Sequence, residues 1–309
     1  MDMPVSTTHT VNVDAGTLRA WPLPMPGGDS DKQQRGHVLI LGGSREMPGA
    51  VILAATAALR AGAGKLTIAT GASVAHLVAL AIPEARVIGL RETAHGSFVR
   101  EAVAELDPLA DQVNAVLIGP GMQDELATAA LVHALLRRLE DGAASVVLDA
   151  CAMGVILHPA GGGAPQAPFQ FEQQVIVTPH AGEMAHLTGI SKQDILAAPD
   201  VHAARAAQRW NAVVALKGAR TVISAPEGER WQHEGGNAGL GTSGSGDTLA
   251  GIIVGLAARG ASLAQAACWG VALHALAGEQ LARRFGILGY LAREIADEIP
   301  ALMEQTARA

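Results

Sequence analysis

A single acidic residue, Asp247, closes a run of small residues, GGNAGLGTSGSG, directly before an apolar helical pattern. The predicted helix has one apolar face, made of Leu249, Ile252, Ile253 and Leu256. The small residues allow the loop to turn several backbone N–H groups toward one point, and the positive end of the helix dipole strengthens their attraction for an anion. The segment therefore predicts a phosphate-binding loop with Gly244, Ser245 and Gly246 at its centre.

Asp247 needs its own explanation, because a carboxylate beside a phosphate repels it unless a metal ion or a hydroxyl group lies between them. We expect Asp247 to be a general base that removes the proton of a hydroxyl group while that hydroxyl attacks a phosphoryl group. The alternative is a helix N-cap, a common position for Asp. An N-cap does not require a run of glycines, each of which loses more backbone entropy than alanine on folding. The glycines therefore favour the catalytic interpretation.

Seven short apolar runs upstream of this loop have the composition of buried parallel strands, and helical patterns separate several of them. The runs are HVLILGG, KLTIAT, ARVIGL, AVLIGPG, SVVLDA, QVIVTPH and VVALKG. This alternation predicts an α/β fold in which helices cover both faces of a mostly parallel sheet. The later segment TVISAPEGERWQHEGG predicts a local antiparallel hairpin with its turn at 226–228, and only helical patterns follow Thr248.

We expect one domain, at 36–309, preceded by a polar and Pro-rich N-terminal arm at 1–35 that shows no periodicity. The segment 260–278 contains no Asp, Glu, Lys or Arg, but it is rich in Ala and Gly. It also contains Gln265 and His274, so we expect a buried helix with a packed histidine rather than a membrane span. The N-terminus has no apolar run of the kind found in signal peptides.

Charge, cysteine content and missing motifs exclude several classes of protein. The net charge is −7 and no basic cluster occurs, so no nucleic-acid partner is expected. Cys151 and Cys268 can form no disulfide framework and lack metal-ligand spacing, which predicts small core residues in a reducing, cytoplasmic setting. Neither the P-loop signature GxxxxGK[ST] nor GxGxxG occurs, so the phosphate site differs from both of those designs.

Further candidate residues lie where predicted strands end, the edge at which ligands bind in open α/β sheets. His180 follows one strand, and we expect it to face a ligand. Lys217 ends another strand and is either a surface lysine or a contact to a phosphate or ribose group. Glu183 suits the first turn of the next helix, with an indirect role toward a metal or phosphate as the alternative. Asp149 ends a buried strand and is either structural or orients a metal-bound water. Asn237 is either a turn residue or a substrate contact.

Four blocks of sequence lie in order between Gly36 and Ala277. They are GHVLILGGSREMPGAVILAATAALRAGAGKLTIAT, VTPHAGEMAHLTG, LKGARTVI and GNAGLGTSGSGDTLAGII. The GSGD segment of the last block is similar to the anion-hole motif of the ribokinase-like superfamily. Together the four blocks resemble the NAD(P)H-hydrate dehydratases within that superfamily. The resemblance implies a three-layer α/β/α ribokinase-like fold.

The resemblance also implies an activity, the repair of NADH and NADPH that have gained water across the nicotinamide C5–C6 double bond. The hydrate hydroxyl would be phosphorylated by ADP, or by ATP, with Mg²⁺ bridging the nucleotide phosphates. Phosphate would then leave and restore the double bond, and ADP would yield AMP. The resemblance places Ala50, Gly121, His180 and Asp247 at the hydrate. It places Lys217, Gly218, Ala219, Arg220, Thr221 and Gly246 at the nucleotide, and it implies a homo-oligomer, often a tetramer.

Several positions depart from the family pattern. Met47 replaces Tyr, Cys151 replaces Asp, Gly241 replaces Ala, Ser243 replaces Gly, and Ser245 replaces Thr. The departures in the loop suggest one alternative, a nucleotide-binding protein without turnover. A second alternative is a small-molecule kinase of the same superfamily that acts on a thiazole or pyrimidine alcohol, although the TPHxGE block argues against it. The choices between ADP and ATP and between the two hydrates stay open, as do the metal ligands.

Overall fold

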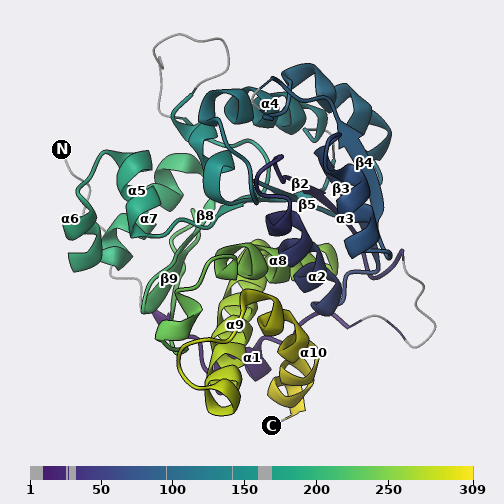
Figure 1. Ribbon diagram of the computed structural model, residues 1–309. Coiled ribbons are helices and arrows are strands. Elements are labelled where there is room, and N and C mark those ends of the chain that lie inside the picture. The colour runs from purple at the N-terminus through teal and green to yellow at the C-terminus, as the bar shows by residue number, and fades with distance from the viewer. Residues whose placement is uncertain are drawn as a thin grey trace, which may run out of the picture.

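Figure 1 shows the computed structural model, which describes residues 10–25, 27, 33–94, 96–140, 142–158 and 169–308. Within these residues, ten strands form one sheet in the order β1-β10-β9-β8-β7-β6-β5-β2-β3-β4. The strands are β1 (Val11–Asn12), β2 (His37–Leu41), β3 (Lys65–Gly71), β4 (Arg86–Leu90), β5 (Ala115–Ile118), β6 (Ser145–Leu148), β7 (Val175–Val177), β8 (Val213–Leu216), β9 (Arg220–Ser224) and β10 (Arg230–Glu234). In this part of the chain, β9 alone runs antiparallel to its neighbours, which confirms the predicted mostly parallel sheet with a local antiparallel hairpin.

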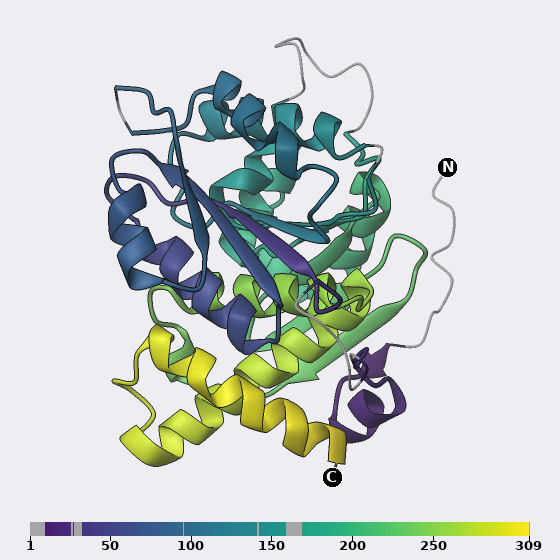
Figure 2. The same ribbon diagram turned by 90° about the vertical axis from the view of Figure 1, so that its right-hand side faces the viewer.

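Helices form a layer on each face of the sheet (Figures 1 and 2). One layer contains α1 (Ala15–Ala20), α2 (Gly49–Arg60), α3 (Ala75–Ala81), α8 (Ser245–Ala258), α9 (Leu263–Phe285) and α10 (Ala292–Arg308). The other contains α4 (Glu125–Arg138), α5 (Ala181–Thr188), α6 (Lys192–Ala197), α7 (Pro199–Trp210) and the 3-10 segments η1 (Arg100–Leu109) and η2 (Ala150–Ile156). A third 3-10 segment, η3 (Ala238–Leu240), precedes α8.

Strand β2 shows why helices pack on both faces of the sheet. Val38 and Ile40 belong to the core beneath α2 and α8, whereas Leu39 and Leu41 belong to the core on the opposite face. Successive side chains of a strand point to opposite faces of the sheet. A strand that is apolar at every position is therefore buried on both sides. The seven predicted strands are confirmed as β2 to β8, although β4 lies at the edge of the sheet and is only partly buried.

Residues 10–25 extend the sheet at its edge, where the sequence predicts only an arm without regular structure. Strand β1 pairs in parallel with β10, and the Trp21 and Trp231 rings stack with centroids 5.6 Å apart. The indole Nε1–H of Trp269 donates to the Trp21 carbonyl oxygen over 2.8 Å. The elements β1 and α1 are thus a correction to the prediction. The division into an arm at 1–35 and a domain at 36–309 stays a prediction.

Helix α9 contains most of the charge-poor segment 260–278, which the sequence predicts to be buried. Most of its residues between Leu263 and Leu281 are buried, and the side chain of Gln265 donates to the carbonyl oxygens of Trp21 and Pro22. A buried polar side chain is stable here because it has hydrogen-bond partners. None of the described helices combines the length and the hydropathy needed to cross a membrane.

The crossing of α2 and α8 gives a test of the packing. A Cβ added at Gly251 would lie 2.3 Å from the carbonyl oxygen of Ala54, which belongs to the facing helix. We expect Gly251→Ala to lower the free energy of unfolding by about 2–3 kcal/mol, because the helices must separate. Gly49→Ala is the matched control, since its Cβ would meet nothing within 4 Å. Equal melting temperatures for the two variants would contradict the close crossing.

Candidate functional site

The carboxyl ends of the parallel strands meet at one edge of the sheet, where the chain reverses its direction across the sheet. From β2 the chain proceeds to β3 and β4 on one side, and it then returns to β5 on the other side of β2. Such a switch point leaves a crevice between the loops that follow the two central strands. The loop after β2 leads to Ala50, and the loop after β5 contains Gly121.

Gly121 and Ala50 are neighbours across this switch point. Gly121 has a φ of 68°, and a Cβ at this position would lie 2.5 Å from the Met47 carbonyl oxygen and 2.9 Å from the Ala50 Cβ. The N–H of Gly43 donates to the Pro120 carbonyl oxygen over 2.7 Å, which joins the two loops. A side chain at position 121 would strain the backbone and push the loops apart. Two of the predicted hydrate contacts thus lie together.

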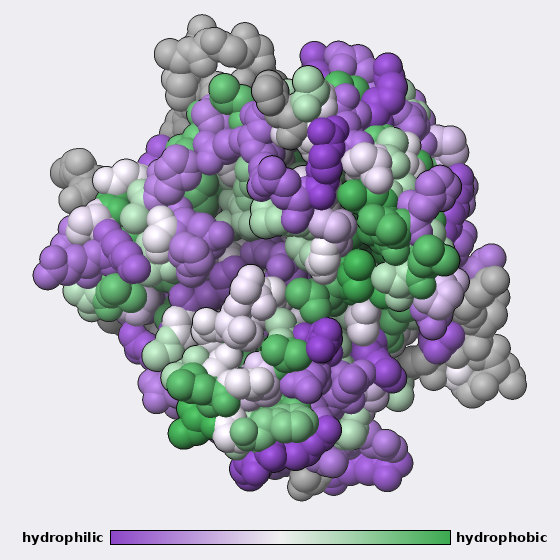
Figure 3. Space-filling model, in the orientation of Figure 1, coloured by the Kyte–Doolittle hydropathy of each residue, from purple (hydrophilic) through white to green (hydrophobic). Residues whose placement is uncertain are grey.

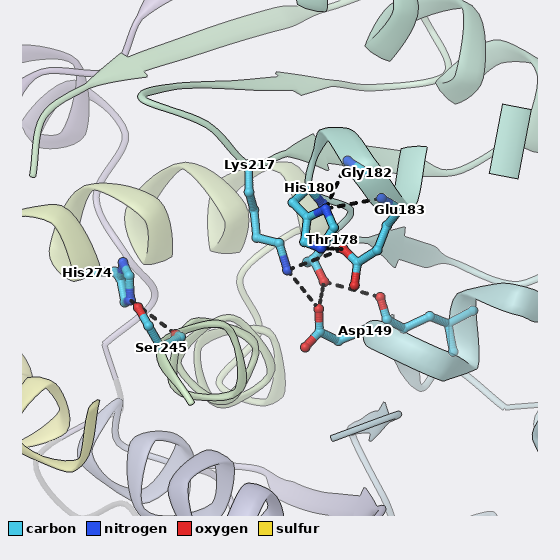
Figure 4. Close-up of polar contacts among 9 residues, drawn as sticks. Asp149, Thr178, His180, Gly182, Glu183, Lys217, Ser245 and His274 are labelled. Carbon is cyan, nitrogen blue, oxygen red and sulfur yellow. Dashed lines mark hydrogen bonds and ion pairs between the residues drawn. The ribbon is translucent and has the colours of Figure 1, made fainter. Parts of the chain in front are cut away.

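Lys217 is the centre of an ionic network at the ends of β6, β7 and β8 (Figure 4). Its Nζ lies 3.0 Å from Oδ1 of Asp149 and 3.9 Å from Oε2 of Glu183. Asp149 is only 3% exposed, and its Oδ1 also accepts a hydrogen bond of 2.6 Å from the Thr178 hydroxyl. Both contacts use the same carboxylate oxygen, and through them Asp149 fixes the position of the ammonium group.

Lys217 keeps its positive charge at neutral pH. Burial lowers its pKa, but the nearby carboxylates of Asp149, Glu183 and Asp247 outweigh this effect, so the pKa is raised. A Cβ added at Gly246 would lie 3.6 Å from Nζ, which places the ammonium against the first turn of α8. A fixed positive charge therefore lies beside the predicted phosphate-binding loop.

Asp247 is half-buried in the first turn of α8, which begins at Ser245. Gly244 occupies the N-cap with a φ of 87°, so the interpretation of Asp247 as an N-cap is wrong. Burial raises the pKa of Asp247 to about 7, with a further increase from Asp149 and a smaller opposing effect of Lys217. A carboxyl group that titrates near neutral pH suits a general base.

A cavity of about 720 Å³ lies between the β8–β9 turn and α8. Its lining includes the predicted nucleotide contacts Lys217, Gly218, Ala219, Thr221, Ser245 and Gly246. Arg220, Gly244 and Asp247 are not among the lining residues, and Nη1 of Arg220 donates instead to Oε1 of Gln232 over 3.0 Å. The volume suits a ligand as large as a nucleotide. Hydrophilic residues border the hollow near the middle of the face shown in Figure 3.

His180 lies between this cavity and a second one of about 380 Å³. It is the N-cap of α5, and its Nδ1 accepts hydrogen bonds from the N–H groups of Gly182 and Glu183 over 3.0 and 3.1 Å. Oε2 of Glu183 accepts in return from the His180 N–H over 2.8 Å, so the predicted place of Glu183 in the first turn is confirmed. Because Nδ1 is an acceptor, we assign the imidazole proton to Nε2, on a side chain that is 59% exposed.

The comparison with known proteins decides the family. Residues 38–301 match the family model described as NAD(P)H-hydrate dehydratase. The chain belongs to the NAD(P)H-hydrate dehydratase family. An ADP-dependent (S)-NAD(P)H-hydrate dehydratase of Xanthomonas campestris is 51% identical to it, over 96% of this chain and 97% of that protein.

Two solved structures agree with this family assignment. The ADP/ATP-dependent NAD(P)H-hydrate dehydratase of Bacillus subtilis, co-crystallised with ATP and Mg²⁺, has a TM-score of 0.78 at 30% identity, covering 96% of this chain and 99% of its own. A ribokinase-like superfamily protein of Enterococcus faecalis has a TM-score of 0.79 at 26% identity, covering 100% of both chains. The predicted ribokinase-like fold and the predicted membership of the dehydratase family are both confirmed. The roles given to single residues remain predictions.

One further residue, His274, lies at the larger cavity. The sequence predicts a packed histidine here, but its Nε2 lies 2.9 Å from Oγ and 3.1 Å from the carbonyl oxygen of Ser245. Its ring also lines the cavity. The two residues are 29 positions apart on different helices, so no local pattern reveals the contact.

Asn237 also lines the larger cavity, but its amide is engaged by the protein. Its Oδ1 accepts hydrogen bonds from the Gly239 N–H and the Tyr290 hydroxyl, each over 2.9 Å. Its Nδ2 donates to the Gly278 carbonyl oxygen over 2.8 Å. The backbone of Asn237 is extended, with a φ of −155°, rather than left-handed. These contacts favour a structural role for Asn237.

The two cysteines differ in their surroundings. Cys268 is buried, as predicted, whereas Cys151 is half-buried and lines the smaller cavity together with Glu125. Burial raises the pKa of the Cys151 thiol, which keeps it protonated.

Over the described residues, no group of three or more His, Cys, Asp or Glu side chains is arranged to hold a metal ion.

Proposed function

We propose that this protein is an ADP-dependent dehydratase of hydrated NADH and NADPH, with ATP as the alternative phosphoryl donor. The products of the ADP reaction are NADH or NADPH, AMP and phosphate. The observation that carries the proposal is the position of Asp247. A carboxyl group with a pKa of about 7 lies in the first turn of α8, close to the charged Lys217 and to Gly246 at the large cavity. This arrangement suits the transfer of a phosphoryl group to a hydroxyl group.

In the first step, Asp247 takes the proton of the hydrate hydroxyl while the hydroxyl oxygen attacks the terminal phosphorus of ADP. The bond from that phosphorus to its bridging oxygen breaks, and AMP leaves with the electron pair. The Gly246 N–H and the Lys217 ammonium stabilise the charge on the phosphoryl oxygens, an effect typically worth a few kcal/mol for each donor. In the second step, phosphate leaves from one nicotinamide carbon and a proton leaves from the next, which restores the double bond.

We also propose that Mg²⁺ accompanies the nucleotide. Mg²⁺ prefers oxygen ligands and keeps several waters, so one or two carboxylates together with substrate phosphates are sufficient. Glu183 and the second carboxylate oxygen of Asp149 fit this requirement, because both carboxylates lie beside Lys217 at the same edge of the sheet. When bound, the ion would neutralise phosphate charge.

The assembly state and location of the protein are further proposals. We propose a homo-oligomer, with a tetramer as the first candidate, in the cytoplasm. A run of exposed apolar side chains at the end of α9 and before α10 supports an oligomer: Phe285, Ile287, Leu288 and Leu291 are 44% to 74% exposed. Light scattering after size-exclusion chromatography measures the mass, and a monomer would contradict the proposal.

Incubation with hydrated NADH, ADP and Mg²⁺ tests the proposed activity. We expect absorbance at 340 nm to recover, with one AMP and one phosphate released for each NADH formed. A small-molecule kinase would instead leave its phosphate on an alcohol product, and a binding protein would bind ADP without releasing AMP. Either result would overturn the proposal. Parallel assays with ATP and with hydrated NADPH determine the preferred substrates.

Two substitutions separate the capping role of His180 from its predicted contact with the hydrate. His180→Asn keeps a side-chain oxygen that caps α5, whereas His180→Ala removes it and is expected to lower the free energy of unfolding by about 1 kcal/mol. Both variants lack the Nε2–H, so both should lower kcat/KM for the hydrate by about tenfold or more. Wild-type kinetics for His180→Asn would exclude the contact.

The pH dependence of the reaction should follow Asp247. The base must be unprotonated, so kcat/KM is expected to rise with pH through about 7 and then level off. The charge of Asp149 contributes to the raised pKa, so Asp149→Asn should move the midpoint to lower pH. Asp297→Asn is the control, because Asp297 forms an exposed ion pair with Arg60. A midpoint that stays in place or moves upward in Asp149→Asn would contradict this assignment.

A further inference from the structure

Two side chains outside the ionic network meet at the wall of the large cavity (Figure 4). Ser245 is the first residue of α8 and is 4% exposed, and His274 belongs to α9. One atom of the ring, Nε2, approaches two oxygens of Ser245, the hydroxyl at 2.9 Å and the carbonyl at 3.1 Å. The mechanism described above does not use this contact.

The contact determines which nitrogen of His274 carries the proton. Burial lowers the pKa of His274 to about 4, so the ring is neutral at physiological pH and holds one proton. A carbonyl oxygen only accepts hydrogen bonds, so a favourable contact at 3.1 Å requires the proton on Nε2. With the proton on Nδ1 instead, the lone pair of Nε2 would face a lone pair of the Ser245 carbonyl oxygen at this distance.

The tautomer in turn determines the state of the Ser245 hydroxyl. The Nε2–H is shared between the two oxygens of Ser245, so Oγ accepts from His274 rather than donating to it. The backbone N–H of Ser245 already donates to the Thr242 carbonyl oxygen over 3.3 Å. The hydroxyl hydrogen is therefore the donor that Ser245 retains for a ligand in the cavity.

We propose that Ser245 donates its hydroxyl hydrogen to the transferred phosphoryl group and that His274 is the positioning residue that holds this hydroxyl in the donating orientation. The inference rests on the proposed function. The Ser245 hydroxyl would be a third donor to the phosphoryl group. The Gly246 N–H is on the same turn of α8, and the Lys217 ammonium lies beside that turn. A hydroxyl that is already oriented need not reorganise as charge develops on the phosphoryl oxygens.

Variants at both positions test this orientation. Ser245→Ala removes the donor, and we expect kcat to fall about 10- to 100-fold with a KM for ADP within threefold of wild type, since the bond strengthens in the transition state. Ser245→Thr keeps a hydroxyl and should retain most activity. His274→Leu should lower kcat about tenfold. His274→Gln should retain it, because the Gln amide nitrogen can take the place of the Nε2–H.

A double-mutant cycle separates positioning from general packing. If His274 acts through the Ser245 hydroxyl, then His274→Leu should lower kcat by less than twofold in the Ser245→Ala background. Multiplicative losses in the double variant, or a wild-type kcat for Ser245→Ala, would overturn the inference. If His274→Leu does not fold, the comparison of kcat between Ser245→Ala and Ser245→Thr still tests whether the hydroxyl is needed. Wild-type protein that fails to form NADH would overturn the proposed function instead.

Discussion

Asp247→Asn is expected to lower kcat for dehydration of hydrated NADH by about 10³-fold, because an amide cannot accept the proton of the attacking hydroxyl. The substitution preserves shape and removes the charge that would repel a phosphate. Affinity for ADP, measured by titration calorimetry, should therefore stay within a few-fold of the wild type or improve. A variant that turns over at the wild-type rate would exclude Asp247 as the base.

The same substitution should make the protein more stable at neutral pH. The pKa of Asp247 in the folded state, about 7, lies above its ordinary value of 3.8. The group therefore contributes stability that is present below pH 3.8 and is lost as the pH rises through about 7. Asn carries no such penalty, so the variant should gain about 2–4 kcal/mol at pH 8, with the difference shrinking toward pH 4. Urea unfolding at several pH values measures this, and a less stable variant at pH 8 would contradict it.

Lys217→Met is the second substitution with a large expected effect, this time on both folding and activity. It leaves the carboxylate of Asp149, which is 3% exposed, without its ammonium partner. Breaking a buried ion pair from one side costs about 3–5 kcal/mol. Loss of the cation beside the phosphate-binding loop should also lower kcat/KM by about 10²-fold.

A double variant distinguishes these two effects of Lys217. Adding Asp149→Asn to Lys217→Met removes the unpaired charge, so about half of the lost stability should return while activity stays low. Lys192→Met, at an exposed lysine of α6, is the control and should change neither quantity. Recovered activity in the double variant would show that Lys217 serves folding alone.

The sequence predicts well those elements that neighbouring residues define, such as a run of apolar residues or a pair of turn residues. The runs that became β2 to β8 are mostly apolar, and all of them except the edge strand β4 are largely buried. The hairpin turn at 226–228 follows from its Pro and Gly, with a φ of 112° at Gly228. The strand Val11–Asn12 could not be predicted, because its two residues are exposed and are held by pairing with β10. Pairing of that kind depends on a partner some 220 positions away.

In the candidate site, too, the sequence predicts residues that are neighbours along the chain but not the contacts between distant residues. Asp247 and the small residues before it are neighbours in sequence, so their chemistry can be inferred locally. The partner of Lys217, by contrast, is Asp149, 68 positions earlier, and the partner of Ser245 is His274, 29 positions later. Sequence reasoning places Asp149 and Lys217 at strand ends without showing that they meet. It gives no reason to bring His274 to the loop at all, because the residue fits the pattern of a buried helix.

The short strand β1 has a consequence for handling the protein. Without residues 11 and 12, β10 would form the border of the sheet and present unpaired backbone groups, which are a template for intermolecular strand association. The Trp21 ring, which stacks on Trp231, would be lost with them in a chain trimmed back to His37. Such a trimmed chain should aggregate although every predicted catalytic group is intact. The amino-terminal segment thus keeps the edge of the sheet paired, and the solubility of the protein depends on it.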